Sequence, residues 1–360
     1  MNALQQLHDL GQSVWLDNIR RELLSSGTLA KWVQEWAVTG LTSNPTIFEQ
    51  AIGHGSDYDA AIQRHAKQGG SPADVFFAIA LEDISAAADL FRPVYEHSGG
   101  LDGFVSLEVS PALADDADGT IAEAKRLHAA AARPNVLIKV PGTSAGLLAI
   151  EELILAGVPI NVTLLFSRAH YLDAAYAYLK GLERRVAAGR KPDIPSVASL
   201  FVSRWDVATA EQLPADLRNR VGNAVGAQAY QAYRGLIASA RWYQLAARGA
   251  RPQRLLFAST GTKSKTLPDT YYISALAAPQ TVNTMPEATL AAFADHGTIG
   301  APLAPDGAAA AAALRRIGAA GVDLDALGAE LQIKGRDAFA ASFDQLLERV
   351  RRKMHASRAA

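Results

Sequence analysis

Short apolar segments alternate with longer segments of helical periodicity along most of the chain. The short segments are rich in apolar and β-branched residues and are bounded by Gly, Pro or Asn, which is the pattern of buried strands. We predict strands at 13–17, 40–45, 103–109, 135–140, 158–163, 196–202, 254–259 and 281–286. Between them we expect helices at 18–26, 29–36, 47–97 (broken near 69–72), 120–132, 145–156, 168–188 and 219–248.

Further helical patterns lie near both ends of the chain. Leu4, Leu7 and Leu10 recur at helical spacing, and six consecutive alanines at 308–313 favour a helix with a small packing face. A final helix is predicted from the apolar stripe Phe339, Phe343, Leu346, Leu347 and Val350.

Eight strand patterns separated by helical patterns indicate a parallel sheet. Eight repeats favour closure into a (β/α)₈ TIM barrel over an open Rossmann sheet, and no G-x-G-x-x-G follows the first strand. No linker divides the chain, so we expect residues 1–360 to form one barrel domain with extra N- and C-terminal helices. Helical insertions at 53–100 and 180–195 are left unexplained by any chemistry.

Composition removes several classes of function. The chain has 360 residues, a formal net charge of −1 and no cysteine, which excludes disulfides, thiolate chemistry and Cys-bound metal. A near-neutral charge gives no broad basic surface for nucleic acid or acidic lipid. No signal-peptide pattern or membrane-spanning apolar run is present, so we expect a cytoplasmic protein without a nucleic-acid or membrane partner.

Lys139 stands out because it lies near the end of the apolar strand 135–140, just before Pro141. Proline cannot continue the ladder, so this lysine falls at the carboxyl end of a buried strand, where α/β barrels place their chemistry. Burial disfavours the ammonium form, and a neutral amine can attack a carbonyl to form a Schiff base. A lysine that merely pairs with a carboxylate or extends out of the strand end is the structural alternative.

Other polar residues recur at the predicted carboxyl ends, where a closed barrel would bring them together around one rim. They are Asp17, Asn44, Glu108, Asn161, Thr163 and Ser199. Carboxylates, amides and a hydroxyl around a lysine are the groups that imine chemistry needs to move protons, orient water and bind hydroxyls. Alternatives remain for three of them: Asp17 as a helix N-cap, Asn44 as a turn residue and Glu108 as a structural partner of Lys139.

With these residues identified, the chain resembles the transaldolase family, in its longer bacterial subfamily. The matching stretches are SVWLDNI (13–19), GLTSNPTIF (40–48), SLEVSP (106–111), LIKVPGT (137–143), INVTLLFS (160–167) and SLFVSR (199–204). The resemblance implies a class I aldolase-type barrel that moves a dihydroxyacetone unit from fructose 6-phosphate or sedoheptulose 7-phosphate to glyceraldehyde 3-phosphate or erythrose 4-phosphate. It also implies the non-oxidative pentose phosphate pathway, sugar phosphates as partners and no cofactor. Separately, the absence of cysteine and of an H-x-x-x-H pairing predicts that the protein has no metal site.

The same resemblance implies a role for each candidate residue. Lys139 would be the Schiff-base lysine, and Asp17 the general acid/base. Glu108 and Thr163 would hold a catalytic water, while Asn44 and Asn161 would bind substrate hydroxyls. Ser199 and Arg204 would form the phosphate site.

The chain departs from the family pattern after its seventh strand, where shorter members carry a phosphate-binding arginine. Here the stretch 259–265 contains Lys263 and Lys265 but no arginine. Lys263 is the expected replacement, with Lys265 as the alternative; a lysine would act as a point charge and not as a fork. The Gly-Thr-Lys-Ser string at 261–264 is not a P-loop, because Leu256 occupies the position of the first glycine.

Two other functions fit parts of the pattern. A related lyase that releases free dihydroxyacetone would use the same lysine, and a sugar-phosphate-binding barrel would lack catalysis. Lys139, Asp17 and Glu108 together argue against the second, because binding alone does not need a buried amine. The sequence leaves open whether the protein is a monomer or a homodimer and which donors and acceptors it prefers.

Overall fold

Eight parallel strands in sequential order form a closed barrel in the computed structural model, which describes residues 2–356. The barrel closes where β1 pairs with both β2 and β8. The strands are β1 (Gln12–Asp17), β2 (Val38–Thr42), β3 (Val105–Glu108), β4 (Val136–Pro141), β5 (Ile160–Leu165), β6 (Ser196–Phe201), β7 (Gln253–Ala258) and β8 (Thr281–Met285). The predicted (β/α)₈ barrel is confirmed.

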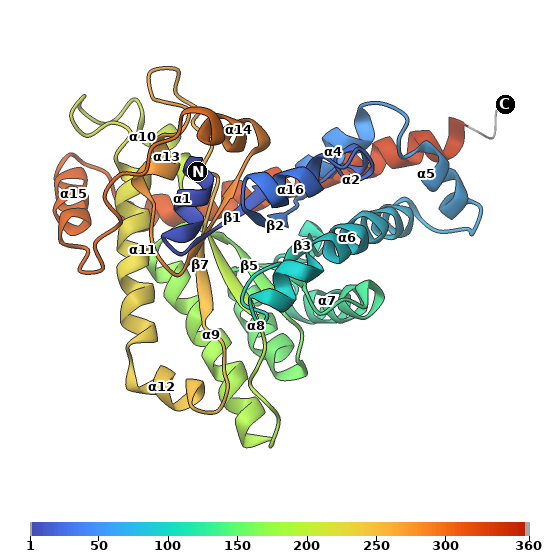
Figure 1. Ribbon diagram of the computed structural model, residues 1–360, viewed down its shortest axis with the longest axis horizontal. Coiled ribbons are helices and arrows are strands. Elements are labelled where there is room, and N and C mark those ends of the chain that lie inside the picture. Colours follow the sequence, from blue (N-terminus) through green and yellow to red (C-terminus); the bar gives the residue numbers. More distant parts are fainter. Residues whose placement is uncertain (1, 357–360) are drawn as a thin grey trace.

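Helices surround the barrel and connect its strands (Figure 1). The N-terminal half contains α1 (Ala3–Asp9), α2 (Arg21–Ser25), α3 (Thr28–Glu35), α4 (Pro45–Gly53), α5 (Asp59–Ala66), α6 (Pro72–His97), α7 (Ala117–Ala131) and α8 (Ser144–Ala156). The C-terminal half contains α9 (Arg168–Ala187), α10 (Ser203–Thr209), α11 (Val221–Ile237), α12 (Ala240–Ala246), α13 (Tyr271–Ala275), α14 (Glu287–His296), α15 (Ala308–Ala319) and α16 (Leu324–Ala356). None of these helices is long and apolar enough to cross a membrane.

Several predicted helices are divided or shifted in the structure. The predicted run 47–97 forms three helices, because the chain also breaks after α4, where Gly55 adopts a left-handed conformation with φ +86°. The predicted run 219–248 forms two, because Ser239 accepts a hydrogen bond from the Trp242 amide and so caps α12. The short helices α10, α13 and α14 were not predicted.

The second strand ends earlier than predicted, which changes the setting of Asn44. β2 ends at Thr42, so Asn44 lies in the connection and not on the strand. Its side-chain oxygen accepts a hydrogen bond from the Ile47 amide at 3.0 Å, and Pro45 occupies the first helical position of α4. This is the usual start of a helix, with a polar cap before proline.

The chain around Lys139 folds as its residue types dictate. Pro141 is the last residue of β4, and the Thr143 hydroxyl accepts from the Gly146 amide at 3.1 Å to begin α8. A Cβ atom at Gly142 would lie 2.3 Å from Leu165 Cδ2 on the neighbouring strand, so a larger residue here would require that leucine side chain to move. Lys139 is thereby placed near the carboxyl end of a strand buried along its whole length.

The C-terminal helix α16 runs along α4, α5 and α6 on the carboxyl side of the barrel (Figure 1). Phe343 of α16 packs edge-on against Phe76 of α6, with ring centroids 5.6 Å apart. Thr46 at the start of α4 donates to Ser342 at 2.9 Å, and Lys353 donates to the Gly55 carbonyl at 2.9 Å. The segment 53–100, unexplained by the sequence, therefore holds α16 against the barrel.

Candidate active site

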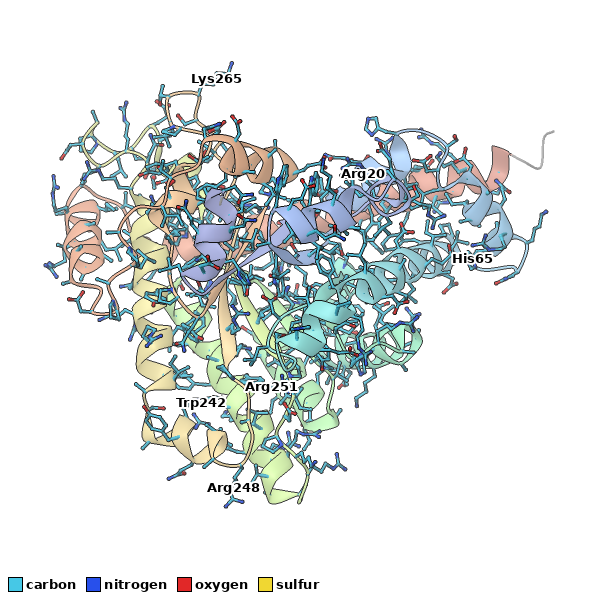
Figure 2. All side chains as sticks on the ribbon, viewed as in Figure 1. Arg20, His65, Trp242, Arg248, Arg251 and Lys265 are labelled. Atoms are coloured by element: carbon cyan, nitrogen blue, oxygen red, sulfur yellow. The ribbon has the colours of Figure 1, made fainter. Side chains whose placement is uncertain are left out.

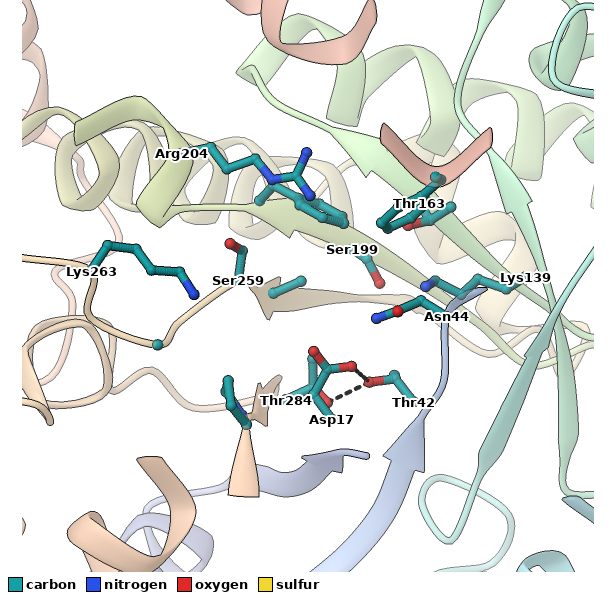
Figure 3. Close-up of a pocket in the computed structure, with 15 residues that line it drawn as sticks. Asp17, Thr42, Asn44, Lys139, Thr163, Ser199, Arg204, Ser259, Lys263 and Thr284 are labelled. Carbon is teal, nitrogen blue, oxygen red and sulfur yellow. Dashed lines mark hydrogen bonds between the residues drawn. The ribbon is translucent and has the colours of Figure 1, made fainter. Parts of the chain in front are cut away.

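A pocket of about 130 Å³ opens at the carboxyl ends of the strands (Figure 3). Seven of the residues expected to form the site line this pocket: Asp17, Asn44, Lys139, Thr163, Ser199, Arg204 and Lys263. Glu108 and Asn161 are not lining residues and contact the pocket through others. The barrel thus brings residues from distant parts of the sequence to one rim, as expected for strands whose carboxyl ends meet.

Lys139 forms a buried ion pair with Glu108. The lysine is 4% exposed, and its amine donates to Glu108 Oε2 at 2.9 Å and to the Ser43 carbonyl at 3.0 Å. Register explains the contact, because Glu108 on β3, Lys139 on β4 and Asn161 on β5 are direct neighbours. Residues paired in this way on parallel strands point to the same side of the sheet.

The electrostatics of this pair follow from its burial. Burial raises the pKa of the Glu108 carboxyl, the positive charge of Lys139 opposes that shift, and the negative charge of Asp17 adds to it. A carboxylate with a raised pKa accepts a proton more readily than an exposed glutamate does. Glu108 is therefore suited to accept a proton from a donor in contact with it.

Asp17 lies at the end of β1 and faces Arg204 across the pocket (Figure 3). The Thr42 hydroxyl donates to Asp17 Oδ1 at 2.7 Å, and Thr42 in turn lies 2.7 Å from the Thr284 hydroxyl. Burial raises the pKa of Asp17, while the hydrogen bond from Thr42 and the charges of Lys139 and Lys263 lower it. The alternative that Asp17 caps a helix is wrong, because the N-cap of α2 is Arg20.

Asn44 is both a residue of the helix-starting turn and a pocket residue, the two interpretations that the sequence left open. Its oxygen caps α4, and its amide nitrogen points into the pocket between Asp17 and Ser199 (Figure 3). Its amide group can therefore still donate to a bound molecule.

Asn161 is fully buried beneath the pocket. It donates to Ser106 Oγ at 3.1 Å and accepts from Ser199 Oγ at 2.7 Å. The structure therefore does not bring Asn161 to the pocket surface, and it contacts the pocket through Ser199, which does line it. The shared face of Asn161 and Thr163 could be read from their spacing, but their different depths could not.

Thr163 presents a buried hydroxyl without a hydrogen-bond partner among residues 2–356. Its side chain lines the pocket on β5, directly opposite Pro141 of β4 in the strand register. A buried, unpartnered hydroxyl is costly unless water or ligand satisfies it. Thr163 is therefore suited to hold a water molecule or a substrate hydroxyl beside Lys139.

The other end of the pocket carries two cations, Arg204 and Lys263, that form no ion pair with any of residues 2–356. Arg204 makes no hydrogen bond or ion pair within the described part of the chain; its guanidinium lies over the rings of Phe201 and Phe339, at 5.2 and 5.8 Å. Burial lowers the pKa of Arg204, although an arginine stays charged. Lys263 lines the same end, whereas Lys265 does not and extends from the outer edge of the molecule (Figure 2). Arg204 and Lys263 together give this end of the pocket an excess of positive charge.

Several lining residues were missed by the sequence analysis. Thr42, Ser259 and Thr284 lie at or just beyond strand ends, and the rule used for the other candidates could have found them. Phe339 also lines the pocket, but it lies on α16. Its place in an apolar stripe predicted only a packed helix, and nothing local marked it as a pocket residue.

The fold and pocket define a (β/α)₈ barrel with a buried lysine–carboxylate pair at one end of its pocket. At the other end lie two cations that form no ion pair within the described part of the chain. Residues 14–350 match the family described as Transaldolase/Fructose-6-phosphate aldolase. A transaldolase of Thermobifida fusca is 46% identical over 366 residues, covering 99% of both chains. A transaldolase of Neisseria gonorrhoeae is 44% identical over 348 residues, covering 96% of this chain and 99% of the relative. A protein named Transaldolase 2 from Nostoc is 39% identical over 373 residues, covering 98% of both.

The chain belongs to the transaldolase/fructose-6-phosphate aldolase family. The resemblance stated from its motifs is thereby confirmed, as is the prediction of a transaldolase-type enzyme.

The Lys139–Glu108 pair predicts a pH-dependent loss of stability in Lys139→Met. Without the ammonium, burial should raise the pKa of Glu108 further, so the folded protein keeps a proton that the unfolded chain releases. The variant should be nearly as stable as the parent below the pKa of an unfolded glutamate and lose stability as pH rises towards the folded pKa. Urea unfolding at about pH 8 should show a loss of roughly 3 kcal/mol, with a smaller loss at about pH 4.5.

The double variant Lys139→Met/Glu108→Gln is the matched control, because it has no carboxyl to titrate. Its stability relative to the parent should recover at about pH 8. An equal loss for Lys139→Met at both pH values would contradict the ion pair as the cause.

Proposed function

We propose that this enzyme transfers a dihydroxyacetone unit through a Schiff base on Lys139. Fructose 6-phosphate and sedoheptulose 7-phosphate would be donors, and erythrose 4-phosphate and glyceraldehyde 3-phosphate acceptors. One observation carries the proposal: the pocket that contains the buried amine paired with Glu108 also contains Arg204, which forms no ion pair with any residue that the structure describes. Full-length relatives named transaldolase support it.

Substrate binding follows from the charges at the two ends of the pocket. The donor phosphate would bind Arg204 and Lys263, with Ser199 as a further donor of a hydrogen bond. An arginine forms two parallel hydrogen bonds to a phosphate, and Lys263 adds a point charge. This orientation directs the ketose carbonyl towards Lys139, and Asn44 can donate to a substrate hydroxyl.

Imine formation begins with proton transfer inside the buried pair. Glu108 takes a proton from Lys139, and the neutral amine attacks the carbonyl carbon to give a carbinolamine. Glu108, together with a water molecule held by Thr163, returns a proton to the carbinolamine hydroxyl, which leaves as water. The resulting iminium is positively charged and remains beside the Glu108 carboxylate.

Bond cleavage then requires a base on the other side of the substrate. Asp17 accepts the proton of the C4 hydroxyl, the C3–C4 bond breaks, and its electron pair moves into the iminium to form an enamine. The aldose phosphate leaves, and dihydroxyacetone stays bound to Lys139. An acceptor aldehyde reverses these steps, with Asp17 returning its proton to the new hydroxyl.

The requirement for an acceptor separates transfer from simple cleavage. With fructose 6-phosphate alone, we expect at most about one equivalent of glyceraldehyde 3-phosphate per site. The enamine would occupy Lys139 until an acceptor aldehyde reacts with it. Adding erythrose 4-phosphate should start steady formation of sedoheptulose 7-phosphate, measured by quenched-flow and mass spectrometry. Continuous release of free dihydroxyacetone at a rate rivalling transfer would favour the lyase instead.

Thr42→Val tests the role of Asp17 through the pH profile. The Thr42 hydroxyl stabilises the Asp17 carboxylate, so removing it should raise the pKa of Asp17 further. Because the ionised form acts as the base, the acid limb of kcat/KM should move to higher pH. Thr284→Val should move the limb less, since Thr284 contacts Asp17 only through Thr42. An acid limb that stays in place in Thr42→Val would remove Asp17 from the proton-transfer step.

Arg204→Ala should discriminate between phosphorylated and unphosphorylated donors. Loss of a charge-assisted contact should lower kcat/KM for fructose 6-phosphate roughly 10- to 100-fold, with a much smaller effect on fructose. Lys263→Ala should also lower kcat/KM for fructose 6-phosphate, but by a smaller factor. Lys265→Ala is the matched control and should change neither donor. Equal losses for both donors in Arg204→Ala would rule out its phosphate role.

A further inference from the structure

Helix α16 reaches the active site through one face, which carries Gln332, Gly335 and Phe339. These positions are three and four residues apart and so lie on the same side of a helix. The Gln332 amide donates to the Gly142 carbonyl at 3.0 Å and to the Leu164 carbonyl at 2.9 Å, at the carboxyl ends of β4 and β5. The helix is therefore fixed to the two strands that carry Lys139 and Thr163.

Gly335 allows the helix to approach the site closely. A Cβ atom there would lie 3.0 Å from Leu164 Cδ2 and 3.2 Å from Arg204 Nη1. The neighbouring side chains would have to move to accept even an alanine. The close approach brings the next turn of the helix, with Phe339, over the pocket.

The Phe339 ring lies between the two functional cations of the pocket. Its centroid is 5.5 Å from Lys139 Nζ and 5.8 Å from Arg204 Cζ, and the side chain is 5% exposed. Phe201 lies 5.2 Å from Arg204 Cζ and packs beside Phe339, with the two ring centroids 6.3 Å apart. Two aromatic rings thus hold the guanidinium where a carboxylate would otherwise be expected.

An aromatic partner has a different consequence from an acidic one. The negative face of a phenyl ring attracts a cation but does not occupy its hydrogen-bond donors. Arg204 is thereby positioned with its donors free for phosphate, whereas a carboxylate would compete with the substrate. Above Lys139 the same ring supplies an apolar cover that attracts the amine cation and, later, the iminium.

We propose that Phe339 of α16 is a positioning and specificity-determining residue: it holds Arg204 for the phosphate and keeps water from the enamine on Lys139. This inference rests on the proposed function, since it concerns the fate of that enamine. Loss of dihydroxyacetone requires a proton on the enamine carbon, addition of water to the iminium carbon and release of the amine. A cover over Lys139 slows the water-dependent steps without affecting addition of an aldehyde bound in the pocket.

The test compares Phe339→Leu and Phe339→Tyr with a matched control, Phe91→Leu. Phe91 is fully buried on α6 and is not a lining residue of the pocket, so its change tests packing alone. Two quantities are measured: KM for fructose 6-phosphate in transfer to erythrose 4-phosphate, and dihydroxyacetone released per sedoheptulose 7-phosphate formed. In Phe339→Leu we expect both to rise roughly fivefold. Phe339→Tyr, which keeps the aromatic face, should restore KM, and Phe91→Leu should change neither.

The outcomes separate this inference from the function on which it rests. If the parent enzyme transfers dihydroxyacetone and Phe339→Leu matches Phe91→Leu in both quantities, Phe339 has only a packing role and the inference fails. If the parent shows no transfer, the proposed function fails first. Circular dichroism establishes that each variant is folded; should Phe339→Leu not fold, Phe339→Met replaces it with the same expected and contradicting results.

Discussion

The ion pair between Lys139 and Glu108 is the constraint on which the rest of the site depends. Two opposite charges buried at strand ends are costly to desolvate, and they persist only where geometry and additional hydrogen bonds compensate. The barrel provides this geometry, because β3 and β4 are in register and the Ser43 carbonyl accepts a second hydrogen bond from the amine. The same burial raises the pKa of Glu108 and so makes it a better proton acceptor than an exposed glutamate. In the proposed mechanism, this acceptor takes the proton that the amine loses before it attacks a carbonyl.

The pocket is divided by chemistry into two ends, and each end is assembled from different strands. Asp17, Thr42 and Thr284 on β1, β2 and β8 form a hydrogen-bonded group around one carboxyl. Arg204 and Lys263, which follow β6 and β7, form the cationic end. Among the described residues, the cations at this end form no ion pair, whereas Lys139 is paired with Glu108. In the proposed function, the first end binds the phosphate and the second carries out proton transfer. The aromatic rings of Phe201 and Phe339 hold Arg204 in place of an acidic partner.

Most of the barrel and its lysine were predictable because strand periodicity and strand-ending residues are local signals. The apolar run before Pro141 indicated both the end of β4 and the place of Lys139, and the recurrence of polar strand ends indicated a shared rim. Depth was not predictable: Asn161 and Thr163 share a face, yet only Thr163 reaches the pocket surface. Phe339 was predicted only as part of an apolar stripe, because its contact with the site depends on how α16 is held by Gln332 and by the segment 53–100. Such long-range contacts have no signature in a local pattern.

The proposed mechanism requires that Lys139 forms a covalent intermediate with the ketose donor. Borohydride reduction in the presence of fructose 6-phosphate, followed by peptide mass mapping, tests this requirement most directly, because reduction converts an iminium into a stable secondary amine. We expect a substrate-derived mass on Lys139 and its absence in a folded Lys139→Arg variant. A label on Lys263 or Lys265, or no label anywhere in an active enzyme, would contradict it.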